Sequence, residues 1–124
     1  MEAGMKDGLD LLAAYADHHA RYFNYSGKAV IWERPDDTLD PTINRLFSTC
    51  HDALNSIGPW ENEKPPAPGF GNARINLLTP SGLYVGQGPI QALMKDRFGG
   101  PVLVAATELL LQLIELAKTR GRTL

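Results

Sequence analysis

The chain has 124 residues, 44% of them hydrophobic and 21% charged, which suits one folded domain over residues 1–124 and argues against wholesale disorder. Its 12 Lys and Arg against 14 Asp and Glu lack the basic excess that binding a phosphate backbone requires, so we expect no nucleic-acid partner. The single cysteine, Cys50, cannot form an internal disulfide, and the sequence does not open on a basic and then apolar leader. We therefore expect a cytoplasmic location.

Residues 5–23 carry apolar side chains at helical spacing. This pattern predicts an amphipathic helix with polar residues on its other side. The apolar stripe is Met5, Leu9, Leu12, Ala16, Ala20 and Phe23.

Residues 28–33, "KAVIWE", favour a short strand because β-branched and aromatic residues are common in sheets. Ala29 and Ile31 share one side of this strand, and Val30 and Trp32 share the other. Since both sides carry large apolar side chains, we expect the strand to be interior or covered on both faces.

The second predicted helix begins near Asp40. Asp40 is predicted as its N-cap, Pro41 as its first helical residue, and Gly58 as its end. The predicted inner face is Ile43, Phe47, Cys50, Leu54 and Ile57.

Residues 59–72 form a long Pro- and Gly-rich loop by prediction. Loops of this length in compact domains are often functional. We consider two interpretations equally: a ligand or partner surface, or a lid that folds over the edge of the sheet. The candidate surface residues, in the loop and beside it, are Trp60, Glu61, Glu63, Phe70, Arg74, Tyr84 and Gln87.

Residues 74–87 have the pattern of a β-hairpin around Thr79-Pro80-Ser81-Gly82. If Thr79 pairs with Leu83, Leu77 faces Val85 across the hairpin. The glycines of "GQGP" that follow lack the Lys-Ser/Thr pair of a phosphate loop. We therefore prefer a purely structural interpretation, in which a strand ends here and a short helix follows with Pro89 at its first position.

Residues 102–118 predict a helix that is apolar around most of its circumference, which indicates burial on more than one side. The apolar window is interrupted by polar residues and is shorter than the roughly 20 residues of a membrane span, so we expect no membrane segment. The helix could be central to the core or form a homodimer interface. The candidate interface residues are Leu103, Leu109, Leu110, Leu113, Ile114 and Leu116. Residues 119–124 form a basic tail that could fray at the helix end.

His18-His19 and Cys50-His51 are adjacent pairs, and adjacent side chains on a helix diverge. We therefore expect neither a metal site nor a Cys-His catalytic pair, and no cofactor. Cys50 falls on an apolar stripe, which favours core packing.

Four carboxylates precede the second helix: Glu33, Asp36, Asp37 and Asp40. The helix dipole stabilises negative charge at this position, and that explains most of them. A cation site or a docking surface for a basic protein is the alternative interpretation.

The expected class is α+β: a small sheet of about three or more strands, including an antiparallel hairpin, covered by three main helices. The leading functional hypothesis is a non-catalytic intracellular interaction or regulatory module that self-associates through its last helix. The alternative is a small-molecule-binding protein or small enzyme with a pocket under the 59–72 loop.

Overall fold

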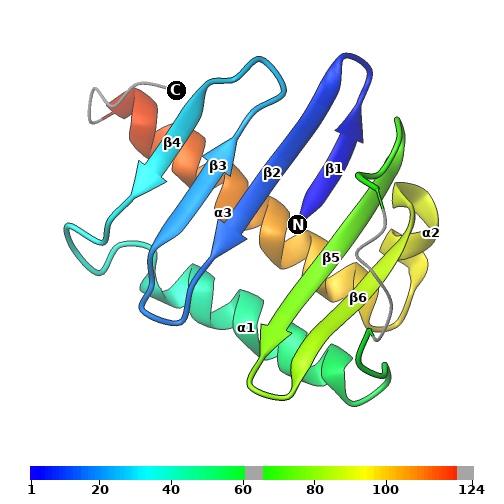
Figure 1. Cartoon of the computed structure of the whole chain (residues 1–124). Helices are drawn as coiled ribbons and strands as arrows, with labels where there is room; N and C mark the ends of the chain where they lie inside the picture. Colours follow the sequence, from blue (N-terminus) through cyan, green and yellow to red (C-terminus); the bar gives the residue numbers. More distant parts are fainter. Residues whose placement is uncertain (61–65, 120–124) are drawn as a thin grey trace.

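The computed structural model describes residues 1–60 and 66–119, which form a sheet of six strands and three helices (Figure 1). The predicted α+β class and the antiparallel hairpin are confirmed, and the sheet exceeds the three strands expected as a minimum. The strands are β1 (Glu2–Met5), β2 (Gly8–Ala14), β3 (Ala20–Phe23), β4 (Ala29–Trp32), β5 (Asn72–Thr79) and β6 (Gly82–Pro89). The helices are α1 (Asp40–Leu54), α2 (Ile90–Lys95) and α3 (Gly99–Thr119).

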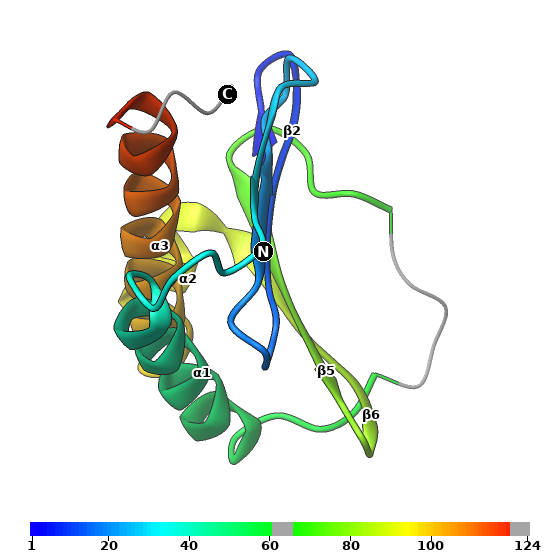
Figure 2. The same ribbon diagram turned by 90° about the vertical axis from the view of Figure 1, so that its left-hand side faces the viewer.

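The sheet has the order β4-β3-β2-β1-β5-β6, with every neighbouring pair antiparallel. Figure 2 shows it edge-on, with the three helices on one side. We call the side that faces the helices the inner face and the opposite side the outer face. Residues 66–71 run along the outer face. The inner face is therefore covered by helices, and part of the outer face is covered by this extended segment.

The helix predicted over residues 5–23 is wrong, because β1, β2 and β3 occupy this part of the chain. Leu12 and Tyr22 pair across β2 and β3 and point into the core, whereas Leu11 and Phe23 pair on the outer face. Because β2 has apolar residues on both faces, its sequence lacks the alternation of polar and apolar residues that usually identifies a strand. Pairing between strands therefore overrode a local pattern that suits a helix.

The second predicted helix is present as α1, with one change at its start. Leu39, not Asp40, is the N-cap, and it makes no side-chain capping bond. The Asp40 carboxylate accepts hydrogen bonds from Arg34 Nε at 3.0 Å and Nη2 at 2.6 Å instead. The helix ends at Leu54, before Gly58.

The last predicted helix is present as α3, and it is buried on two sides. It packs against the inner face of the sheet and against α1, which explains its apolar circumference. Of its 21 residues, eight are buried. Val104 and Leu111, which are 56% and 60% exposed, lie on its outward side.

By length and composition alone, α3 could also cross a membrane. This is weak evidence for a membrane span, because the core helix of a globular fold satisfies the same test. The absence of a membrane segment therefore stays a prediction.

The predicted hairpin is present, but its predicted register is wrong by one residue. Thr79 pairs with Gly82, and Leu77 pairs with Tyr84 rather than with Val85. The turn is tighter than predicted because the Thr79 hydroxyl donates to the Gly82 carbonyl at 2.9 Å and accepts from the Ser81 amide at 3.2 Å. A shift of one residue moves every β6 side chain to the other face of the sheet.

Candidate functional site

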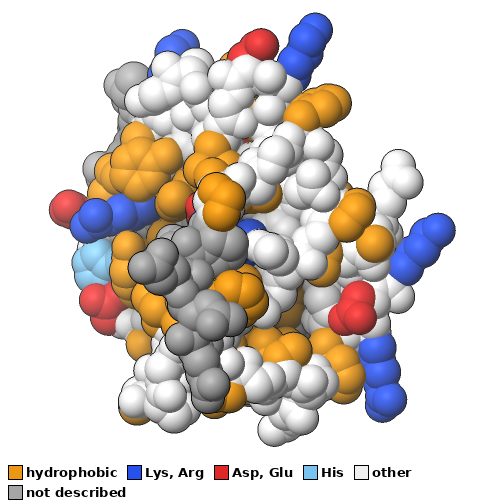
Figure 3. Space-filling view, turned by 45° about the vertical axis from the view of Figure 1, so that its right-hand side comes forward, with side chains coloured by type: hydrophobic (Ala, Val, Ile, Leu, Met, Phe, Trp, Pro, Cys, Tyr) orange, Lys and Arg blue, Asp and Glu red, His pale blue; other side chains and the backbone are white. Residues whose placement is uncertain are grey.

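The outer face of β2, β3 and β4 leaves apolar side chains exposed or half-buried, and none of the helices in residues 1–60 and 66–119 covers them. In β3 and β4 the side chains alternate between buried and exposed. Figure 3 shows hydrophobic side chains gathered on this side of the molecule. We call this region the open face; its residues are Leu9, Leu11, Ala13, Arg21, Phe23, Ala29 and Ile31.

The open face is built from cross-strand rows of neighbouring side chains. One row runs from Leu11 to Phe23 to Ala29, and the next contains Arg21 and Ile31. Phe23 is 40% exposed and Ile31 is 36% exposed. Arg21 is the one charged residue of the open face, and its guanidinium carbon lies 5.9 Å from the centre of the Tyr15 ring. The surface is therefore apolar with a single cation.

β4 is an edge strand, so the expectation that it is interior is wrong. Ile31 is 36% exposed, so the alternative that both faces are covered is wrong as well. Val30 and Trp32 are buried in the core, as their side of the strand requires. Ile31 points to the open face instead. The sequence pattern identified the strand but could not show that its second face lacks cover.

Residues 66–71 cover the outer face beside the open face, over β1 and β5. Gly4 and Phe70 form a β-bridge, and the Gly71 amide donates to the Gly4 carbonyl at 3.1 Å. A Cβ atom built on Gly4 would lie 1.9 Å from the Gly69 carbonyl oxygen. Glycine at position 4 is therefore what lets this segment lie directly on the sheet.

Replacing Gly4 with alanine is expected to displace residues 66–71 from β1, since a contact this short with backbone cannot be relieved by a side-chain rotation. Protease cleavage of this segment should become faster than in the wild type. Gly58→Ala is the control, because a Cβ there meets nothing within 4 Å. Equal cleavage rates in the wild type and Gly4→Ala would contradict this prediction.

Under this segment lies a buried ion pair between Glu2 and Arg74. Arg74 Nη2 is 2.8 Å and 2.9 Å from the two carboxylate oxygens of Glu2, and Nε is 3.0 Å from Oε1. The side-chain amide of Asn76 donates from Nδ2 to the same Oε1 at 2.7 Å, and Arg74 Nη1 donates to the Pro66 carbonyl at 2.9 Å. Arg74 is 2% exposed and Glu2 is 6% exposed. Arg74, a predicted surface residue, therefore fastens the loop to the sheet.

Of the other predicted surface residues, Trp60, Phe70 and Gln87 lie apart, on different parts of the β1, β5 and β6 region. Trp60 extends the edge of β6, with its amide 2.6 Å from the Leu83 carbonyl, and Phe70 is exposed beside β1. Gln87 is exposed on the outer face opposite Arg74, whereas Tyr84 pairs with Leu77 and faces the inner side. Glu61 and Glu63 lie outside the described residues.

The predicted dimer-interface residues of α3 lie mainly within the protein's own core. Leu103, Leu109 and Leu113 are buried there. The remaining three are partly buried against the same core: Leu110, Ile114 and Leu116. The exposed apolar residues of α3 are Val104 and Leu111, which the sequence interpretation did not select.

The acidic segment before α1 is partly used within the fold. The hydrogen bond from Arg34 lowers the pKa of Asp40 below its usual value. The Asp36 carboxylate accepts from the Thr38 amide at 3.0 Å. Among residues 1–60 and 66–119, no group of three or more His, Cys, Asp or Glu could hold a metal ion.

Cys50 packs against the core, and burial raises the pKa of its thiol. His18 and His19 lie in the connection between β2 and β3 rather than on a helix. His18 Nε2 is 2.8 Å from Asn44 Oδ1, so this ring joins the connection to α1.

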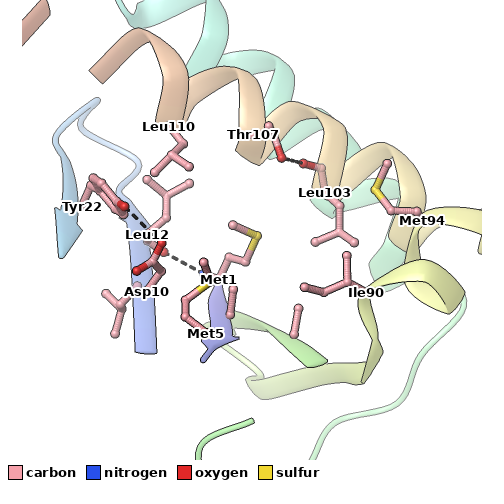
Figure 4. Close-up of a pocket in the computed structure, with 13 residues that line it drawn as sticks. Met1, Met5, Asp10, Leu12, Tyr22, Ile90, Met94, Leu103, Thr107 and Leu110 are labelled. Atoms are coloured by element: carbon pink, nitrogen blue, oxygen red, sulfur yellow. Dashed lines mark hydrogen bonds between the residues drawn. The ribbon is translucent and has the colours of Figure 1, made fainter. Parts of the chain in front are cut away.

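A cavity of about 240 Å³ lies on the inner side, between the sheet and helices α2 and α3 (Figure 4). Its lining comes from β1, β2, β3, β5 and both helices. Since residues 66–71 cover the outer face, this cavity is not the pocket that the sequence predicted under the 59–72 loop. Asp10 and Tyr22 lie at one end of it.

The Tyr22 hydroxyl donates to Asp10 Oδ2 at 3.1 Å. Burial, reinforced by this hydrogen bond to a carboxylate, raises the pKa of Tyr22 to about 12. The unfolded chain keeps the usual tyrosine pKa of about 10. The folded state therefore holds the phenol proton more tightly, and the stabilisation that this provides is complete below about pH 10.

We expect this stabilisation to be lost as the pH rises from about 10 through 12. Absorbance titration should show one of the chain's 4 tyrosines ionising above the others. Tyr22→Phe should remove that late step and reduce the pH dependence of the free energy of unfolding in this range. Simultaneous ionisation of all the tyrosines in the folded wild type would contradict the assignment.

Comparison of the chain with protein-family models, with curated proteins and with solved structures found no significant match.

Proposed function

We propose that the protein is a non-catalytic protein-interaction module and that a partner protein binds its open face. The observation that carries this proposal is the set of apolar side chains, led by Phe23 and Ile31, that β2, β3 and β4 leave exposed or half-buried where none of the described helices covers the sheet. Contiguous exposed apolar surface is typical of protein-interaction sites.

The composition of the open face supports the same proposal. The centres of protein interfaces are enriched in aromatic residues and arginine and depleted in lysine and carboxylates. The open face contains Phe23 and Arg21, and none of its residues is Lys, Asp or Glu. The nearest carboxylate in the same row, Glu2, is buried and paired with Arg74.

The chain's convergent polar side chains support a non-catalytic role because they stabilise the fold. Arg74, Glu2 and Asn76 fasten the loop to the sheet, and Arg34 holds Asp40 at the start of α1. A cytoplasmic location is part of this proposal, on the basis of the single cysteine.

We propose a second copy of the chain as the partner to test first, since sheets commonly stack face to face. The sequence interpretation assigned self-association to the last helix. The inward leucines of α3 are already buried, so an interface on this helix would have to use Val104 and Leu111. The two routes to a homodimer therefore depend on different residues.

Light scattering after size-exclusion chromatography, over a wide dilution range, tests self-association. We expect a concentration-dependent dimer in the wild type, and Phe23→Glu or Ile31→Glu should weaken it by roughly tenfold or more. Leu111→Glu, at an exposed apolar residue of α3, is the control and should dimerise normally. Circular dichroism should establish that each variant is folded.

Two results would count against this proposal. A wild type that remains monomeric throughout contradicts self-association. A dimer that Leu111→Glu disrupts while Phe23→Glu leaves it intact contradicts the open face and favours the helix.

A further inference from the structure

We propose that the cavity between the inner face and helices α2 and α3 binds a small uncharged apolar molecule, of the size of indole or a short alkylbenzene. This site lies on the opposite side of the sheet from the open face. Leu11 is the one residue that borders both, and the inference does not depend on the proposed function.

The size of the cavity selects a small molecule. An engineered apolar cavity of roughly 150 Å³ takes up benzene. The cavity here has a volume of about 240 Å³. It therefore suits a molecule somewhat larger than benzene and is too small for a segment of folded peptide.

All 3 methionines of the chain line this cavity. Met1 and Met5 approach from the β1 end, and Met94 approaches from α2 (Figure 4). Met5 is 38% exposed and Met94 is 46% exposed, so solvent reaches part of the lining. Methionine side chains are flexible and polarisable, and they adapt to apolar ligands of different shapes.

The polar groups at the cavity are already hydrogen-bonded. The two oxygens of Asp10 accept from the Tyr22 hydroxyl at 3.1 Å and from the Tyr25 amide at 2.8 Å. The Thr107 hydroxyl donates to the Leu103 carbonyl at 2.8 Å, and the terminal ammonium of Met1 donates to the Leu12 carbonyl at 2.7 Å. Most of the remaining lining is apolar, including Leu12 and Ile90. Because a charged group would lose its hydration here without gaining a free partner, the site favours an uncharged ligand.

Carbon-13 labelling of the methionine methyl groups gives a direct test, because the chain yields only 3 such signals. Titration with indole, whose ring current shifts nearby methyl resonances, should move all of these signals along one saturable curve. Tryptamine and indole-3-acetate carry opposite charges on the same ring system. Each should bind at least tenfold more weakly than indole.

Two variants place the binding in the cavity. Ala73→Leu fills it from β5, and Thr107→Phe fills it from the exposed side of α3, where folding is less at risk. Each should weaken indole binding at least tenfold. Ala16→Leu, the same change as Ala73→Leu but at an exposed position between β2 and β3, should leave the indole affinity unchanged.

The proposal would be overturned by methyl signals that do not move up to the solubility limit of indole, or by shifts that never saturate. Equal indole affinity in the wild type and a folded Thr107→Phe would also overturn it. Tighter binding of tryptamine than of indole would reject an uncharged ligand and assign the site to an amine that pairs with Asp10.

Discussion

Replacing Arg74 with methionine is expected to lower the free energy of unfolding by about 3–5 kcal/mol, the usual cost of removing one partner of a buried ion pair. Arg74 is 2% exposed, and its loss leaves the Glu2 carboxylate buried without its cation. Chemical denaturation followed by circular dichroism measures the change. Arg21→Met is the matched control, because Arg21 is exposed on the same face; its effect should stay within about 0.5 kcal/mol.

A double variant distinguishes the effect of leaving one charge buried alone from the effect of changing the packing at this position. Glu2→Met with Arg74→Met removes both charges together. Since apolar replacements of a buried pair are often neutral or stabilising, the double variant should be more stable than Arg74→Met alone. If Arg74→Met loses less than about 1 kcal/mol, the pair does not hold the loop and sheet together as described.

Replacing Leu109 with alanine is expected to lower the free energy of unfolding by about 2–5 kcal/mol. Leu109 is fully buried where α3 meets the rest of the core. Leu111→Ala removes the same atoms from an exposed position of the same helix and should change stability by less than about 0.5 kcal/mol. Urea denaturation of both variants measures the difference.

This pair also tests how α3 is oriented about its own axis. Similar losses from Leu109→Ala and Leu111→Ala at low protein concentration would mean that the outward side of α3 is buried too. That result would contradict the packing of α3 described above. It would favour the hypothesis that α3 forms a homodimer interface.

Much of the fold could be predicted from local sequence signals. α1 and α3 followed from apolar spacing, and the hairpin followed from "TPSG" between two apolar runs. Each of these signals is formed by residues close together in the sequence, so it can be recognised without knowledge of the tertiary structure.

The N-terminal strands could not be predicted in this way. Leu9 and Leu11 face outward while Leu12 faces the core, so β2 has apolar residues on both faces and no visible alternation. Leucine and alanine also favour helices. What fixes β2 as a strand is its pairing with β1 and β3, and only the tertiary structure supplies that.

The open face could not be predicted either, because its strands β2 and β3 were not predicted. The sequence pattern predicts that Phe23 lies on the apolar stripe of a helix and that Ile31 lies on a strand that is interior or covered on both faces. Their cross-strand neighbours, Leu11 and Ala29, join them into one surface only when the sheet is known. In β3 the side chains alternate between buried and exposed, but "ARYF" shows no alternation of polar and apolar residues because the exposed Phe23 is apolar.

The measurement that tests the open face most directly is a dilution series of methyl-labelled protein by NMR. We expect the methyl signals of Ile31 and Leu11 to shift with protein concentration along one saturable curve, while those of Val104 and Leu111 stay fixed. Concentration-dependent shifts at Val104 and Leu111 with none at Ile31 would contradict the open face as the surface for self-association. So would the absence of any shift up to about 1 mM, the concentration at which even a contact of only about −4 kcal/mol is half formed.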